Sequence, residues 1–227
     1  MRKLLVFLIV VAGLLVAADR FAAWAAGQIV ADRIARAYQL DQPPDVQVQG
    51  IPFLTQWSSG HYQEVDLRLP TVTTNNVSIT NLSAQMHDVS TVAFATSSAD
   101  AAGATIGQVD VQGVVPYSTI PLPQGFQVAP QGSQLQLSGS ISAAGVSVPV
   151  SATVSVSVQD GSLQLTAGQV DVPSAFSRLG IASILNQQLS AVRTTVQLPL
   201  GAHLDAVSVT PNGLALAASA SNVQMPH

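Results

Sequence analysis

Few residues in this sequence have the type and spacing that catalysis or metal binding requires. The histidines do not stand at metal-ligand spacing from one another, and no HExxH motif occurs. They are His61, His87, His203 and His227. Serines are common, yet none lies in a GxSxG or SxxK motif, and the absence of cysteine excludes thiolate metal sites, cysteine nucleophiles and disulfides. The sequence therefore predicts a protein that is not an enzyme and uses no metal or cofactor.

One pair of carboxylates stands close enough together to act jointly. Glu64 and Asp66 occupy alternate positions of an extended stretch, so both side chains point to the same face of the predicted strand. Such a pair suits acid–base catalysis or a weak cation site. A solvated strand face is the interpretation that we strongly favour, with Arg68 as the expected ion-pair partner.

Cations are rare in the main part of the chain. Beyond Leu40 the only basic residues are Arg68, Arg178 and Arg193, against ten carboxylates. Clustered Lys and Arg are absent, which excludes a nucleic-acid-binding protein. A guanidinium suits a phosphate, so Arg178 and Arg193 are candidates to contact an anionic headgroup. The alternative, which we favour, is helix capping or pairing with Asp171 or Asp205.

The N-terminal segment is typical of an export signal. Arg2 and Lys3 precede an apolar run over residues 4–18. Fifteen residues of helix reach about 22 Å, short of the roughly 30 Å hydrocarbon core, which favours a signal peptide over residues 1–26 with cleavage at Ala23-Trp24-Ala25. The alternative is a signal anchor that tethers the chain to the cytoplasmic membrane through residues 4–18. In both cases the remainder is exported to the periplasm or cell envelope.

A second helical pattern follows the apolar run. Over residues 27–40, Val30, Ile34, Ala37 and Tyr38 share one face, and two prolines end the helix. Packing of this amphipathic helix on its own domain is the favoured interpretation. The alternative is a helix lying on a membrane surface.

After residue 44 the apolar pattern changes to alternation, which predicts antiparallel hairpins. The expected strands are 46–49, 62–72, 76–82, 90–96, 108–115, 133–142, 146–159, 162–172, 194–200, 204–210 and 214–225. One helix is expected over 174–192. We therefore predict an α+β fold in which a long, strongly curved antiparallel sheet wraps around a helix, forming a single domain over residues 27–227. Only 9% of residues are charged and 48% are hydrophobic, so the interior is apolar. Side chains fill that interior, or they leave room for a ligand.

Two stretches resemble a known family. "GIPFLTQWSSGHYQEVDLRLPTV" (50–72) contains a GxPFLTQ element, and "LPLGAHLDAVSVTPNGLALAASASNVQM" (198–225) contains LPLG followed by a hairpin. Both are similar to the LmeA-type family of actinobacterial secreted phospholipid-binding proteins. The resemblance implies a tubular, BPI-like (TULIP) lipid-binding fold and a role in lipid handling or lipoglycan assembly in a mycolate-type envelope. Family members often carry Arg after LPxG, where this chain has Ala202 and His203, so a headgroup contact at that point is in doubt.

The predicted function is an envelope phospholipid-binding protein that shelters acyl chains in an apolar tunnel, with the membrane surface and a phospholipid as its partners. Phe53 and Leu54 either line the mouth of that tunnel or pack in the core of the protein. The expected lipid-binding residues are Val30, Ile34, Phe53, Leu54, Phe94, Phe176, Leu179, Leu185, Arg178 and Arg193. The alternative function is a structural or adhesive β domain with a filled core.

Overall fold

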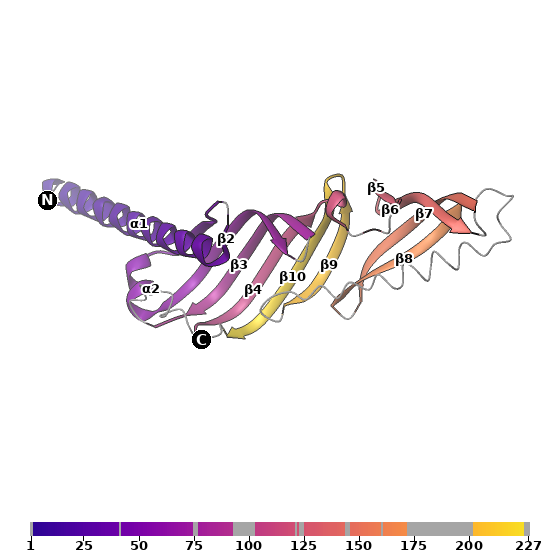
Figure 1. Cartoon of the computed structure of the whole chain (residues 1–227). Coiled ribbons are helices and arrows are strands. Elements are labelled where there is room, and N and C mark those ends of the chain that lie inside the picture. The colour runs from indigo at the N-terminus through magenta and orange to yellow at the C-terminus, as the bar shows by residue number, and fades with distance from the viewer. Residues whose placement is uncertain are drawn as a thin grey trace. The chain divides into compact units, whose positions relative to one another are not determined.

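The computed structural model describes residues 2–40, 42–74, 77–92, 103–120, 122, 125–143, 146–159, 161–171 and 202–224 (Figure 1). The chain forms two compact units. Unit 1 consists of Met1–Pro70, Leu82–Val111 and Ala220–His227, and unit 2 consists of Thr71–Asn81 and Gln112–Ser219.

Two sheets and two α-helices make up the described residues. The helices are α1 (Arg2–Tyr38) and α2 (Phe53–Ser59), with one 3-10 turn, η1 (Tyr117–Thr119). The strands are β1 (Asp45–Val48), β2 (His61–Thr74), β3 (Val77–Ser90), β4 (Thr105–Val115), β5 (Gln127–Gln131), β6 (Gln134–Ala143), β7 (Val146–Gln159), β8 (Ser162–Asp171), β9 (His203–Thr210) and β10 (Gly213–Gln224). One sheet has the order β1-β2-β3-β4-β10-β9 and the other β5-β6-β7-β8. The predicted α+β class with long antiparallel strands is confirmed.

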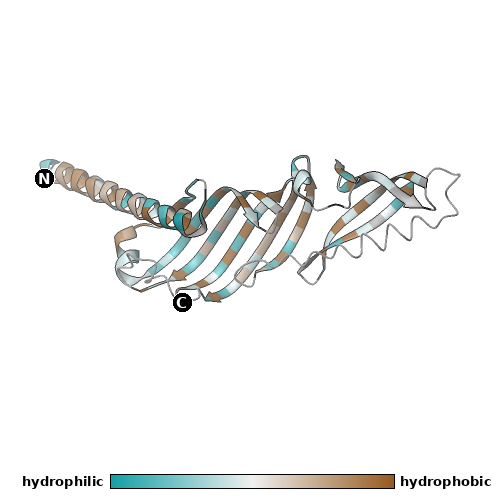
Figure 2. Cartoon of the chain, in the orientation of Figure 1, coloured by the Kyte–Doolittle hydropathy of each residue, from teal (hydrophilic) through white to brown (hydrophobic). Residues whose placement is uncertain are grey.

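In unit 1, α1 is a single helix of 37 residues. The predicted apolar helix and the predicted amphipathic helix are therefore continuous, because no proline lies between Arg2 and Tyr38 to interrupt the backbone hydrogen bonds. The apolar run of residues 4–18 is almost entirely exposed, and Figure 2 shows it as the hydrophobic half of the helix.

The second half of α1 packs on β1, as the favoured interpretation expected, but with a different face. Its buried residues are Ala23, Gly27 and Ala31, whereas Val30 is 43% exposed. The helix approaches the backbone of β1 so closely that a Cβ atom at residue 27 would overlap the carbonyl oxygen of Val46. Small residues are buried here because larger ones would not fit.

In unit 2, the predicted alternation produces the core. The even-numbered residues of β7 from Val148 to Val154 are buried, and the intervening residues are exposed or half-buried. β7 pairs with β6 and β8 in antiparallel register, and Gly161, with φ 69°, turns the chain between β7 and β8. The bounds predicted for β7, 146–159, are those observed.

Other expectations differ from the structure in length or position. β3 continues to Ser90 instead of ending at residue 82, and β5 was not predicted. Residues 53–59, for which no helix was predicted, form helix α2. The predicted helix 174–192 and strand 194–200, and most of the predicted strand 90–96, lie outside the described residues.

Candidate lipid-binding site

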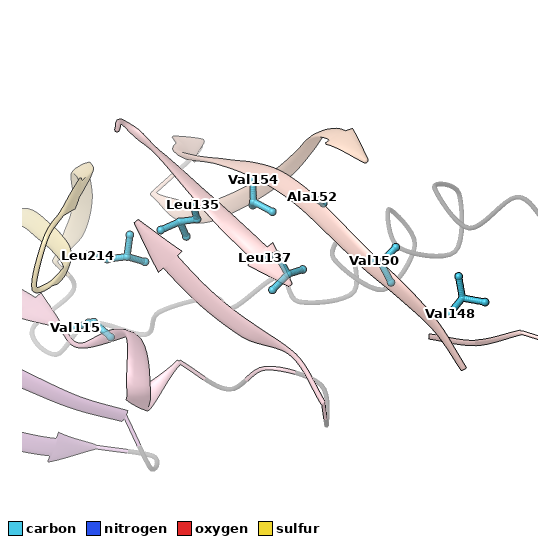
Figure 3. Close-up of a cluster of buried hydrophobic side chains, with 8 residues drawn as sticks. All are labelled: Val115, Leu135, Leu137, Val148, Val150, Ala152, Val154 and Leu214. Carbon is cyan, nitrogen blue, oxygen red and sulfur yellow. The ribbon is translucent and has the colours of Figure 1, made fainter. Parts of the chain in front are cut away.

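A cluster of buried hydrophobic side chains lies in unit 2, and we call it the apolar layer. It consists of Val115, Leu135, Leu137, Val148, Val150, Ala152, Val154 and Leu214 (Figure 3). Half-buried apolar side chains pack against it, among them Val156 and Leu165, which face each other across β7 and β8. The layer is built from aliphatic side chains of modest size, and such a surface interacts with hydrocarbon through burial and dispersion alone.

A polar contact borders the apolar layer. Tyr117 packs against the layer, and its hydroxyl donates a hydrogen bond of 2.6 Å to the carbonyl oxygen of Thr210, at the end of β9. Burial raises the pKa of Tyr117. The phenol therefore stays neutral in the folded protein and ties η1 to β9.

A group of side-chain hydrogen bonds lies in unit 1, where α1 meets the start of α2. The carboxylate of Asp19 accepts hydrogen bonds from the backbone N–H groups of Phe53, at 2.9 Å, and Leu54, at 3.0 Å. Arg20 donates to Asp19 at 2.9 Å and also to the carbonyl oxygen of Gly50. Asp19 is only 5% exposed, so a charged side chain is buried here with its partners supplied by the first turn of α2 and by Arg20.

The predicted lipid-binding residues that the structure describes all lie in unit 1. Phe53 is buried and its ring lies 6.5 Å from that of Tyr62, so it packs in the unit. Leu54 is 47% exposed, Val30 is exposed and Ile34 is half-buried. The other predicted residues, Phe94, Phe176, Arg178, Leu179, Leu185 and Arg193, lie outside the described residues. A lipid contact at any of the ten stays a prediction.

The acidic pair of β2 does not form the solvated face that was expected. Asp66 is 7% exposed and accepts a hydrogen bond of 2.9 Å from the side chain of Gln49, because the residues at and after β1 cover this part of β2. Arg68 is exposed and stands opposite Asp45 in the strand register. Within the described residues, no three His, Cys, Asp or Glu side chains gather into a group that could hold a metal ion.

The comparison with known families decides the identity. The sequence profile of the LmeA-like phospholipid-binding family matches residues 17–219. The chain belongs to this family. The match contains the whole apolar layer of this LmeA-like protein and also the Asp19 contacts of unit 1. No curated protein and no solved structure matches the chain.

Sequence reasoning missed the Asp19 contact in this LmeA-like chain. The one available signal was the spacing of Asp19, Ala23, Gly27 and Ala31, which repeats every four residues and marks one helix face. The partners of Asp19 lie 34 and 35 residues away in sequence, so their identity depends on the fold.

Proposed function

We propose that this LmeA-like protein binds a phospholipid by packing its acyl chains against the half-buried apolar side chains that border the apolar layer of unit 2. The observation that supports the proposal is the layer itself, eight buried aliphatic side chains bordered by half-buried ones within a family of phospholipid-binding proteins. Each methylene removed from water contributes about 0.8 kcal/mol, so ten sheltered methylenes give about 8 kcal/mol before the cost of association.

The headgroup and the setting belong to the same proposal. The headgroup is anionic, and Arg178 or Arg193 supplies the cation that binds it. The protein acts outside the cytoplasmic membrane, in lipid transport or lipoglycan assembly, and it works without catalysing a reaction. The exposed apolar half of α1 supports export, because it has the composition of a signal or anchor helix.

Native mass spectrometry of the full chain tests lipid binding directly. The protein, extracted in mild detergent and delipidated, is incubated with dioleoyl phosphatidylglycerol or with dioleoyl phosphatidylcholine. We expect a one-to-one complex that survives detergent removal, with tighter binding of the anionic lipid. Failure to bind either lipid would favour the alternative of a structural β domain with a filled core.

A matched pair of variants on β7 tests the proposed surface. Val156→Gln places an amide on the half-buried apolar side of the strand, whereas Ser157→Gln places the same amide on the exposed side. Burying an amide without a partner costs about 1–3 kcal/mol, so Val156→Gln is expected to weaken lipid binding roughly tenfold or more. Ser157→Gln should bind like the wild type, and the lipid-free melting temperature separates lost binding from lost folding.

A further inference from the structure

Helix α1 changes its surroundings abruptly at Asp19. Residues 12–18 are exposed, whereas Asp19, Ala23, Gly27 and Ala31 are all buried at intervals of four residues. We call these four residues the α1 stripe. They form one face of the helix, and the close approach of Gly27 to the carbonyl oxygen of Val46 shows that this face lies against β1. The packed part of the helix therefore begins before residue 20.

Asp19 also provides the hydrogen-bond acceptor that the N-terminus of α2 lacks. The first N–H groups of a helix have no partner within it, and α2 has no side-chain cap from its own Pro52. The carboxylate of Asp19, which belongs to α1, accepts hydrogen bonds from two of these N–H groups of α2. The neighbouring guanidinium of Arg20 offsets the charge of Asp19 and also donates a hydrogen bond to the carbonyl oxygen of Gly50. The junction thus depends on two residues that precede the predicted cleavage site.

Cleavage after Ala25 would remove half of the α1 stripe. Asp19, Arg20 and Ala23 would be lost, and the N–H groups of Phe53 and Leu54 would lose their acceptor. Unit 1 would lose these hydrogen bonds and the packing of Ala23, so a mature chain without these residues would have a weakened unit 1. The family match, which begins at residue 17, includes the complete stripe.

Exposed apolar side chains lie at the start of α2 and in the loop before it. Ile51 is 65% exposed and Leu54 47% exposed, and Phe21 and Trp24, one turn beyond Asp19, are exposed with their rings 5.6 Å apart. Trp and other aromatic side chains are enriched at the level where a membrane meets water. Directly upstream lies the exposed apolar run, which is apolar enough to cross a membrane and has Arg2 and Lys3 at its far end. The occupant that fits these exposed apolar side chains is a lipid bilayer.

We propose that α1 is retained as a membrane anchor, and that Asp19 locks it to α2 so that Ile51 and Leu54 lie in the bilayer surface. The anchor spans with residues 4–18, whose helical length of about 22 Å the bilayer accommodates by local thinning. This proposal concerns unit 1 and does not depend on phospholipid binding by unit 2.

The mass of the mature chain tests retention. The full chain with a C-terminal tag is expressed in a bacterium that has secretory signal peptidase, and the intact mass is measured in the membrane and soluble fractions. We expect a chain that includes residues 1–25, in the membrane fraction, resistant to carbonate extraction. A chain shortened at the Ala23-Trp24-Ala25 motif would overturn the proposal.

Fluorescent labelling tests the position of α2. Because the protein has no cysteine, Leu54→Cys gives a single site for the probe NBD. Gln47→Cys is the control, since it is exposed on β1, whose Val46 contacts α1 at Gly27, about 12 Å along the helix beyond Asp19. The labelled full chains are placed in phosphatidylcholine–phosphatidylglycerol vesicles that contain spin-labelled lipid. We expect quenching at residue 54 to exceed that at residue 47 by about twofold or more.

Variants of the two acidic residues of α1 test the role of Asp19. Asp19→Ala in the labelled Leu54→Cys chain should reduce quenching towards the value at residue 47, because α2 is no longer fixed to the anchor. Asp32→Ala, at an exposed position of the same helix, should leave it unchanged, and Asp19→Asn should keep part of it. Equal quenching at residues 47 and 54, or no effect of Asp19→Ala in a chain that retains its circular dichroism, would overturn the locked junction.

Discussion

The α1 stripe of unit 1 and the apolar layer of unit 2 are both packed surfaces, but they are built in different ways. From Val148 to Val154 of β7 every second residue is buried, and all of these residues are Val or Ala. Along α1 every fourth residue is buried, and the set contains a carboxylate and a glycine. In the strand, each buried residue makes the same contribution, the burial of an aliphatic side chain. In the helix, single residues have different roles, since Asp19 accepts hydrogen bonds and Gly27 allows close packing.

This difference predicts how each surface responds to change. In the apolar layer, the buried side chains are aliphatic and of similar size, so neighbouring side chains can repack around a conservative replacement with little loss of stability. In the α1 stripe, Asp19 has specific hydrogen-bond partners and Gly27 has no space for a side chain. Even a small replacement should therefore lower the stability of unit 1. The apolar layer should fail when its apolar character is lost, and the α1 stripe when its shape or its single acceptor is lost.

A charge in the centre of the apolar layer should have the largest effect. Val148 is fully buried, so Val148→Asp leaves a carboxylate without water or a partner. We expect a loss of at least about 3 kcal/mol in the free energy of unfolding of unit 2. Ser147→Asp, on the exposed side of the same strand, is the control. Hydrogen exchange of peptides from β6 and β7 measures the stability of unit 2 in both variants. Equal protection in the two variants would show that the layer is not a tightly packed core.

The two surfaces also differ in how far the sequence predicted them. The alternation of residues 146–159 was enough to give β7 its bounds and its buried face, because period two fixes which side chains share a side. The α+β class and the family followed from the same local patterns and from the GxPFLTQ and LPLG elements. These features depend on residues that are close together in sequence.

The features that were missed depend on distant partners. The face containing Val30 was predicted by hydrophobicity, yet the helix buries Ala31 and Gly27 because the carbonyl oxygen of Val46 lies so near. Helix α2 is too short for periodicity to reveal, and it begins at residue 53, where Asp19 accepts its first N–H groups. The residues near Asp19 in sequence mark one helix face, but they do not indicate its partners, which lie 34 and 35 residues away.

A methyl group in the α1 stripe should have an effect of intermediate size. Gly27→Ala brings a Cβ atom against the carbonyl oxygen of Val46 and should weaken the packing of α1 on β1 by about 1–3 kcal/mol. Gly13→Ala is the matched control in the same helix, because a Cβ there meets no atom within 4 Å. Hydrogen exchange of peptides covering residues 19–35 and 45–48 is the measurement. Similar exchange in both variants would mean that the helix adjusts freely and that shape does not limit this surface.

The smallest effect is expected from a single hydrogen bond at the border of the apolar layer. Tyr117→Phe removes the bond to Thr210 and should reduce the free energy of unfolding of unit 2 by about 1 kcal/mol at neutral pH. Burial places the pKa of Tyr117 above its unfolded value of about 10, so its contribution is fully present below pH 10 and is lost as the pH rises through the folded pKa. The difference between wild type and Tyr117→Phe should therefore shrink at alkaline pH.

Tyr62→Phe in unit 1 is the comparison for this last change. Burial also raises the pKa of Tyr62, so the two variants have similar chemistry in different units. We expect Tyr117→Phe to alter exchange in β9 and Tyr62→Phe to alter exchange in β2, each without affecting the other strand. If both variants changed both strands equally, the two units would unfold together. The α1 stripe would then stabilise the apolar layer as well, since loss of either surface would cost the free energy of both.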